Sequence, residues 1–338
     1  MRLVRRVLLG LLALALAAAG LGALGLRRAL APAAAVGPPV LFVVSEGAGL
    51  RRVAEDLERA RLVRSARAFE LLGRWRGAGG ELRAGEYELR ASEAPGEILE
   101  AIRSGRVKMW EVAIPEGLTA AEVAARVEAA GLAERAAFLA VVNDPASPTR
   151  LGVEGPGLEG YLFPETYHLA RGLPAEEVVG ALVGQFRSVW EPLAPAAAAR
   201  GLSMREAVTL ASIVEKETAV AEERPLVAAV FHNRLRLGMR LETDPTVIYG
   251  IPDFDGNLTR AHLEDEANPY NTYRIAGLPP GPIASPGAAA LRATLEPAQS
   301  DALFFVSRND GSHVFSRTYD EHVVQVRRFQ GRRGGSGG

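Results

Sequence analysis

Residues 210–218, LASIVEKET, run from an apolar segment directly into three charged residues. The apolar side chains that precede the charges fill most of two helical turns, which is typical of a buried helix. Ser203 followed by Glu206 matches a capping box, so the pattern predicts a helix from Met204 to about Glu217. A carboxylate at the end of a buried helix costs free energy unless it is paired, solvated or used. The stretch therefore marks a helix end at which an acid is available for chemistry.

The composition permits sizeable cores and excludes several kinds of site. The chain has 338 residues, 48% of them apolar, and a formal net charge of −1, which gives no support for nucleic-acid binding. The sequence has no cysteine, which excludes disulfides, zinc–thiolate sites and cysteine nucleophiles. The five histidines show no metal-ligand spacing, and neither an HExxH nor a GxSxG motif is present. We therefore expect no metal site and neither a zinc protease nor a serine hydrolase.

The N-terminal segment predicts a membrane anchor. Residues 7–26 contain only Val, Leu, Gly and Ala, and about 20 apolar residues span a bilayer as a helix. More positive charge precedes this run than follows it, so the positive-inside rule favours a cytoplasmic tail at 1–6 and an extracytoplasmic remainder. A cleaved signal peptide is the alternative, because residues 33–35, AAA, resemble a cleavage site. The length of the apolar run favours a retained anchor, followed by a linker at 27–38.

Residues 40–70 and 110–139 resemble each other at an offset of seventy positions. Each copy predicts an apolar strand, a Glu-Gly turn, an amphipathic helix and a second helix around a Phe. A strand at 82–89 and a helix around 98–102 follow the first copy. The resulting strand–helix–helix–strand set at 39–107 has the layout of a LysM module, a small fold that binds N-acetylglucosamine chains. A plain α/β spacer is the alternative, and 108–150 is predicted to be a connecting α/β segment.

The remainder, residues 151–330, is predicted to be a mixed α/β catalytic domain, which makes the whole chain an α+β protein. The pattern predicts helices at 175–190 and 222–237, and strands at 303–306 and 313–315 that pair across the NDG turn at 309–311. Loops at 158–167, 241–250 and 268–287 are rich in Pro, Gly, aromatic and amide residues, which suits the wall of a sugar-binding cleft. The Gly/Ser-rich tail at 331–338 is expected to be disordered.

Two glutamates compete for the role of an acid at the helix end. Cleavage of a glycosidic bond needs a proton donor, and a carboxylic acid with a raised pKa can supply it. On an ideal helical wheel Glu217 lies nearer the centre of the apolar arc than Glu215, so spacing alone mildly favours Glu217. Both residues could instead be solvated caps. Glu165 and Asp244 are weaker candidates, since each can also be explained by loop or turn structure.

Six segments of the chain resemble the endolytic murein transglycosylase family, also called YceG-like. In chain order they read EGYLFPETY (159–167), ASIVEKET (211–218), FHNRL (231–235), LETDPTVIYG (241–250), YNTY (270–273) and GLPPGPI (277–283). The resemblance covers roughly residues 40–328, and the predicted anchor agrees with it. His232 and Glu242 depart from the family pattern, and neither bears on the proposed acid.

The resemblance implies an activity, a location and a catalytic residue. The family is bacterial and anchored in the cytoplasmic membrane, with a LysM-like subdomain beside an extracytoplasmic catalytic domain. It cleaves MurNAc–GlcNAc β-1,4 bonds within nascent glycan strands, which leaves 1,6-anhydro-MurNAc ends and terminates strand elongation. The resemblance implies Glu215, the first Glu of the Glu-Lys-Glu triplet, as the catalytic acid. The implied partners are peptidoglycan glycan strands, the cytoplasmic membrane and peptidoglycan synthases of the elongation machinery, with no cofactor.

The substrate cleft is expected to be lined by residues of the aromatic and polar loops, namely Tyr161, Glu165, Asp244, Asn271 and Tyr273. An internal C6-hydroxyl nucleophile needs no second carboxylate, which fits a sequence in which no partner acid stands out. Two alternatives stay open. A muramidase-type hydrolase would leave ordinary reducing MurNAc ends, and a membrane-tethered peptidoglycan-binding scaffold would leave the strands uncut.

Overall fold

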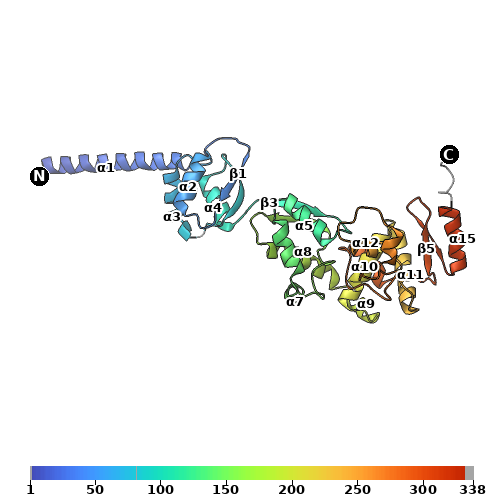
Figure 1. Cartoon of the computed structure of the whole chain (residues 1–338). Helices are drawn as coiled ribbons and strands as arrows, with labels where there is room; N and C mark the ends of the chain where they lie inside the picture. Colours follow the sequence, from blue (N-terminus) through green and yellow to red (C-terminus); the bar gives the residue numbers. More distant parts are fainter. Residues whose placement is uncertain (1, 81, 332–338) are drawn as a thin grey trace. The chain divides into compact units, whose positions relative to one another are not determined.

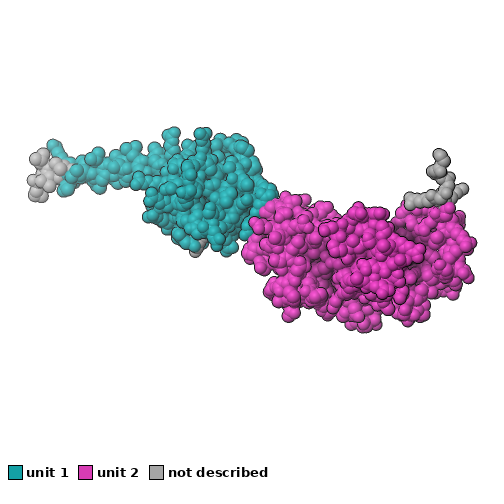
Figure 2. Space-filling view, viewed as in Figure 1, with its two compact units in different colours: residues 1–110, 170–172 teal, residues 111–169, 173–338 magenta. Residues whose placement is uncertain are grey.

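The computed structural model describes residues 2–80 and 82–331, so most of the predicted disordered tail at 331–338 and the first residue of the predicted cytoplasmic tail lie outside the described residues. Within the described part the chain divides into two compact units (Figure 2). Unit 1 comprises Met1–Trp110 with Ala170–Gly172, and unit 2 comprises Glu111–Leu169 with Leu173–Gly338. The mixed α/β character predicted from the sequence is confirmed (Figure 1).

Unit 1 begins with a long apolar helix. The segment Leu8–Ala29 has a mean hydropathy of 2.2, and its leucines are exposed along the helix. By length and composition it can cross a membrane, and signal sequences share these features. The elements of unit 1 are α1(Arg2–Ala29), β1(Pro39–Val44), α2(Leu50–Arg59), α3(Ala66–Trp75), η1(Ala78–Gly80), β2(Gly85–Arg90) and α4(Pro95–Ser104).

The small core of unit 1 forms between one antiparallel strand pair and its helices. β1 pairs with β2 and places Phe42 opposite Tyr87, and both side chains are buried with Leu57 and Phe69 from α2 and α3. The strand–helix–helix–strand order therefore occurs where the sequence predicts it, although β2 begins at Gly85 instead of residue 82. The likeness of this arrangement to a LysM module stays a prediction.

Unit 2 holds the second copy of the internal repeat and most of the helices. Its first strand starts at the unit boundary. The elements are β3(Met109–Ile114), α5(Ala120–Ala129), α6(Arg135–Asn143), α7(Ser147–Leu151), β4(Glu165–Ala170), α8(Ala175–Trp190), α9(Ala194–Ala199), α10(Met204–Glu217), η2(Ala221–Glu223), α11(Arg224–Arg236), α12(Asp244–Tyr249), α13(Arg260–Glu264), α14(Ala288–Leu295), β5(Phe304–Ser307), β6(His313–Ser316) and α15(Tyr319–Gln330).

The seventy-residue internal repeat is reflected in where the strands and helices of the two copies begin and end. β1 and β3 have the same length and begin seventy residues apart, and so do α2 and α5. The Glu-Gly turn that follows each strand places Gly47 and Gly117 at φ of 70° and 76°. Glycine adopts this left-handed conformation without the steric cost that a side chain imposes.

Helix α10 is the centre of unit 2. Ser203 caps it, because the Ser203 hydroxyl accepts from the Glu206 amide at 3.2 Å and the Glu206 carboxylate accepts from the Ser203 amide at 2.9 Å. Residues 207–214 are all buried, and α10 packs against α11, α12 and α14. The predicted helix is thus confirmed at both ends, and its last turn is where the charged triplet leaves the core.

The C-terminal part of unit 2 is a hairpin covered by a helix. β5 and β6 pair antiparallel, with Phe304 opposite Ser316 and Ser307 opposite His313, and α15 packs on both strands. The predicted hairpin is confirmed. By contrast, residues 241–250 were expected to be a loop but contain α12. The Asp-Pro pair starts this helix because proline is favoured in the first helical turn, where its missing N–H costs nothing.

Candidate active site

The end of α10 presents two carboxyl groups to different surroundings. Glu215 and Glu217 are two residues apart, which separates them by about 200° around an α-helix. The intervening Lys216 is exposed and donates from Nζ to the Gly117 carbonyl at 3.2 Å. Since the helix packs on several neighbours, the two acids contact different parts of unit 2.

The Glu215 side chain is largely buried, and each of its oxygens accepts a hydrogen bond. Its Oε1 accepts from Arg224 Nη2 at 3.3 Å, and its Oε2 accepts from the Gly287 amide at 3.0 Å. The side chains of Glu215 and Arg224 are only 6% and 13% exposed, so this ion pair lies in a largely desolvated setting. Gly287 is the residue before α14, and Glu215 thereby joins the ends of three helices.

A third charged residue completes this cluster. Glu116 lies in the Glu-Gly turn after β3, and its Oε2 is 3.8 Å from Arg224 Nη2. Partial burial raises the pKa of Glu116, and the negative charge of Glu215 raises it further, while Arg224 opposes both. The turn is fixed by two backbone hydrogen bonds, from Gly117 to the Ser285 carbonyl at 2.9 Å and from Ser285 to the Leu118 carbonyl at 2.8 Å. We call Glu116, Glu215 and Arg224 the anchor cluster.

Glu217 is only partly exposed and belongs to a cleft. The Thr243 hydroxyl donates to its Oε1. Burial raises the pKa of Glu217 to about 7, against the lowering effect of this hydrogen bond, and the nearby charge of Asp244 raises it further. A carboxyl group with such a pKa is partly protonated at neutral pH, which is the property that a general acid needs.

The cleft beside Glu217 has a volume of about 470 Å³. Asp244 and Tyr273 meet on its wall, where the Tyr273 hydroxyl donates to Asp244 Oδ1 at 2.7 Å. The other wall comes from β5, β6 and α15, which the sequence reading had not placed there. The lining residues include Glu217, Arg234, Glu242, Asp244, Tyr273, Phe304, Phe305, His313, Tyr319 and His322.

His313 on the cleft wall is paired with a carboxylate that lies behind it. Glu223, the last residue of η2, accepts from the His313 amide at 2.9 Å through Oε1 and contacts His313 Nδ1 at 2.7 Å through Oε2. Both side chains are largely buried, at 12% and 13% exposure. The sequence reading missed this pair because its members are ninety residues apart and neither belongs to a recognisable motif.

The structure brings two of the predicted cleft residues, Asp244 and Tyr273, together with Glu217. Tyr161 is buried, its ring lies edge-on to Phe186 at 5.0 Å, and its hydroxyl donates to the Glu154 carbonyl. Tyr161 does not line the cleft beside Glu217, and the role in substrate binding that was predicted for it stays a prediction.

Asn271 and Glu165 lie outside the residues that line the cleft. Asn271 is fully buried and its amide donates to three backbone carbonyls, the shortest at 2.7 Å to Asp265. Glu165 is exposed at the start of β4 and accepts from its neighbour Thr166 at 2.9 Å. The role in substrate binding that was predicted for these residues stays a prediction.

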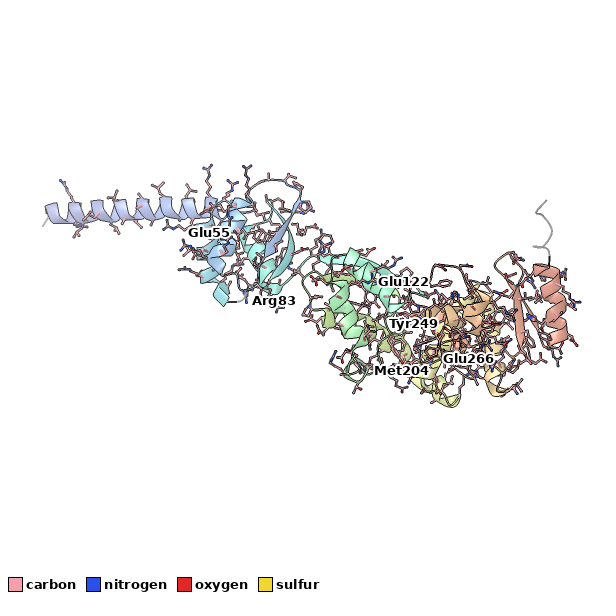
Figure 3. All side chains as sticks on the ribbon, in the orientation of Figure 1. Glu55, Arg83, Glu122, Met204, Tyr249 and Glu266 are labelled. Atoms are coloured by element: carbon pink, nitrogen blue, oxygen red, sulfur yellow. The ribbon has the colours of Figure 1, made fainter. Side chains whose placement is uncertain are left out.

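A second carboxyl group with a raised pKa lies in the EGYLFPETY motif. Burial raises the pKa of Glu159 to about 7, and the hydrogen bond from the Ala120 amide is the main opposing cause. Glu159 accepts from Ala120 at 3.0 Å and from the Tyr249 hydroxyl at 3.2 Å. Tyr249, labelled in Figure 3, belongs to α12, so Glu159 ties the start of α5 to that helix. Its contacts are those of a structural brace.

Within residues 2–80 and 82–331, no group of three or more His, Asp or Glu side chains is arranged to hold a metal ion. The side chains of the cleft wall comprise a carboxyl group of raised pKa, a carboxylate bound to a phenol and an imidazole bound to a carboxylate.

Comparison with known proteins gives a consistent family. A profile of the YceG-like family matches residues 42–328. The endolytic murein transglycosylase of Bacillus subtilis (strain 168) is 30% identical over 295 residues, which cover 82% of this chain and 81% of that protein. The endolytic murein transglycosylase of Streptococcus pneumoniae serotype 2 (strain D39) is 29% identical over 318 residues, which cover 84% of this chain and 57% of that protein.

A solved structure agrees with the sequence comparisons. The crystal structure of a YceG-like protein from Listeria monocytogenes matches with a TM-score of 0.59 and 30% identity, over 85% of this chain and 98% of the other. The family profile spans both units, from β1 to α15. This chain therefore belongs to the YceG-like family.

Proposed function

We propose that this protein is a lytic transglycosylase that cleaves peptidoglycan glycan strands internally. Relatives named endolytic murein transglycosylase share about 30% of its residues across most of the chain. The bond cleaved is the MurNAc–GlcNAc β-1,4 bond of nascent strands, and the product carries a 1,6-anhydro-MurNAc end that terminates elongation. The observation that carries the chemistry is Glu217, an acid of raised pKa on the wall of a 470 Å³ cleft.

The geometry favours Glu217 over Glu215 as the proton donor. Both oxygens of Glu215 accept from N–H groups of Arg224 and Gly287, and Glu215 is not among the residues that line the cleft. Glu217 instead faces the cleft with a single hydroxyl donor, Thr243. The role of Glu215 that the family resemblance implies stays a prediction, and the experiment below separates the two residues.

The reaction needs one acid. Glu217 donates its proton to the glycosidic oxygen of the leaving GlcNAc, and the C1–O4 bond breaks as C1 of MurNAc gains oxocarbenium character. The C6 hydroxyl of the same MurNAc attacks C1, and the Glu217 carboxylate accepts the hydroxyl proton. The acid thus returns to its starting state with no water consumed. Proton transfer of this kind contributes about 10²–10⁴-fold to a rate.

The same proposal places the molecule at the cell envelope. Helix α1 would anchor it in the cytoplasmic membrane with its N-terminus in the cytoplasm, as the charge bias around residues 7–26 favours. Residues 39–107 would act as a LysM-like glycan-binding subdomain and residues 151–330 as the catalytic domain, joined by 108–150. Peptidoglycan synthases of the elongation machinery would be the partners that supply new strands.

A pair of isosteric variants tests this function. Purified wild type, Glu217→Gln and Glu215→Gln are incubated with purified peptidoglycan, and the soluble products are identified by mass spectrometry. We expect anhydro-MurNAc ends from the wild type and none from Glu217→Gln. Retained activity in Glu217→Gln together with a dead Glu215→Gln would reverse the assignment. Reducing MurNAc ends would indicate a hydrolase, and binding without any change in strand length would indicate a scaffold.

A further inference from the structure

The cleft contains a polar atom that the proposed reaction does not yet use. His313 lines the cleft, and its Nδ1 is held by Glu223. Within the described residues its Nε2 has no protein partner, and it is not among the buried polar atoms that lack one. Nε2 therefore keeps some exposure to solvent, and His313 lines the same cleft as Glu217.

The Glu223 carboxylate determines whether Nε2 of the neutral His313 ring is a hydrogen-bond donor or an acceptor. An ionised carboxylate only accepts hydrogen bonds, so a neutral His313 ring must carry its proton on Nδ1. The other nitrogen is then a bare acceptor, because the bond made by one ring nitrogen fixes the state of the other. The second oxygen of Glu223 accepts from the His313 amide, so one carboxylate fixes both the backbone and the ring.

Packing removes the remaining freedom of the ring. The His313 ring lies edge-on to Phe305 with ring centroids 5.5 Å apart, and it is 6.5 Å from Phe315. His322, the other histidine of the cleft, differs because its Nδ1 is buried without a partner. His313 is therefore the imidazole that is both oriented and accessible.

The other polar groups near Glu217 already have at least one partner each. Asp244 accepts from Tyr273 through Oδ1, Thr243 donates to Glu217, and the Arg234 guanidinium donates to the backbone carbonyls of Leu241 and Leu303. A sugar entering the cleft would bring several hydroxyl groups that each need an acceptor. Nε2 of His313 is such an acceptor, held in place before the ligand arrives.

We propose that His313 is a substrate-positioning residue whose Nε2 accepts a hydrogen bond from a hydroxyl of the glycan bound at Glu217, with Glu223 fixing the required tautomer. The inference deepens the proposed function and rests on it. No covalent step is added, since the proton that moves is still exchanged between the substrate and Glu217.

The variant Glu223→Gln tests the tautomer without removing the contact. A glutamine keeps an oxygen for the His313 amide but presents an N–H to Nδ1, which shifts the ring proton to Nε2 and turns the acceptor into a donor. The ring state is read from ¹⁵N chemical shifts of the full-length chain in detergent micelles, and activity from the rate at which anhydro-MurNAc ends form on purified peptidoglycan. We expect the two ring shifts to exchange and kcat/KM to fall by about 10–100-fold.

A second pair of variants distinguishes substrate positioning from a purely structural role. The amide of Gln places its oxygen near the position of Nε2, whereas the amide of Asn imitates Nδ1. Substrate positioning predicts that His313→Gln is more active than His313→Asn. A structural clamp to Glu223 predicts the reverse order, with the melting temperatures following the same order.

The outcomes separate the inference from the proposed function. If the wild type forms anhydro ends while Glu223→Gln switches tautomer and keeps kcat/KM within twofold of wild type, the positioning role is overturned and the function stands. A ring that stays protonated on Nδ1 in Glu223→Gln also overturns it. If the wild type forms no anhydro ends, the proposed function fails, and the inference fails with it.

Discussion

Glu215 and Glu217 are separated by a single lysine, yet one is locked in an ion pair with Arg224 and the other lies on the wall of an open cleft. The α-helical turn causes this division, since it directs two neighbouring acids to different surroundings. The free-energy cost of burial is offset differently at the two positions. The charged Glu215 carboxylate is stabilised by the Arg224 guanidinium, whereas Glu217 avoids part of the cost of a buried charge by holding a proton.

Removal of Arg224 should destabilise unit 2. Arg224→Gln leaves the Glu215 carboxylate buried without its cation, which costs about 3 kcal/mol of unfolding free energy. Urea unfolding followed by circular dichroism measures this loss. The exposed pair between Arg317 and Asp301 provides the control, because Arg317→Gln should change stability by less than about 1 kcal/mol. Equal losses in the two variants would contradict the desolvated character of the anchor cluster.

Activity should fall with rising pH as Glu217 loses its proton. The folded-state pKa of about 7 means that the acid form is depleted above neutrality. We expect kcat/KM to fall about tenfold per pH unit above that value. The rate at which anhydro ends form, measured between pH 5 and 9, checks this. A rate that stays constant up to pH 9 would remove Glu217 from the role of general acid.

The unfolding free energy should fall as rising pH removes the proton from Glu217. Burial raises the pKa of Glu217 above its value in the unfolded chain, so the folded state binds the proton more tightly. Its contribution is fully present below the unfolded pKa of about 4.3 and is lost as pH rises through about 7. Glu217→Gln should therefore flatten the decline in unfolding free energy between pH 5 and 8. Part of the decline should remain in this variant, because Glu159 is still present and its pKa is also about 7.

A side chain at Gly287 should displace the Glu116 carboxylate. A Cβ at this position would overlap the Glu116 carboxylate, although the backbone φ of −76° suits any residue. Because Glu116 is flexible and 46% exposed, its side chain can move away, and Gly287→Ala should cost less than about 1 kcal/mol while it separates Glu116 from Arg224. Gly184→Ala in α8, where nothing lies within 4 Å, is the matched control and should be neutral or slightly stabilising. Recovery of stability in the double variant Gly287→Ala, Glu116→Ala would locate the clash.

Asn271 offers a test between structural and ligand-binding roles. Its amide donates to three backbone carbonyls, so Asn271→Asp would replace a donor by an acceptor and leave buried carbonyls unpaired. We expect a loss of about 2–3 kcal/mol in unfolding free energy. An unchanged melting temperature combined with a raised KM would instead support the contact with substrate that the sequence suggested.

The sequence predicted those elements whose signals are local. Helices α8 and α10 occur at their predicted positions because periodicity and, for α10, the Ser203 cap act within one segment. The β5–β6 hairpin follows from its turn, where Asn309 and Gly311 both adopt positive φ. Helix α12 was missed, because six residues around an Asp-Pro pair carry too little periodicity to outweigh the appearance of a turn.

The site was predictable only in part. Helical spacing located the acids and mildly favoured Glu217, which the structure places in the cleft. The partners of these acids could not be found in the same way. Glu116 lies about one hundred positions from Glu215, and Glu223 lies ninety from His313, so only tertiary packing brings them together. Tyr161 and Asn271 are both buried outside this cleft, and their residue types suit a core position as well as a sugar-binding one, so the sequence alone does not separate the two roles.

The seventy-residue repeat shows what distinguishes Glu116 from its counterpart. Glu46 and Glu116 occupy the same position in the two Glu-Gly turns and both are exposed, but Glu116 also lies 3.8 Å from Arg224. The strands and first helices of the two copies have matching bounds, so the local backbone does not explain the difference between the two glutamates. The same turn therefore carries a solvent-facing charge in one unit and a partner for the charges around α10 in the other.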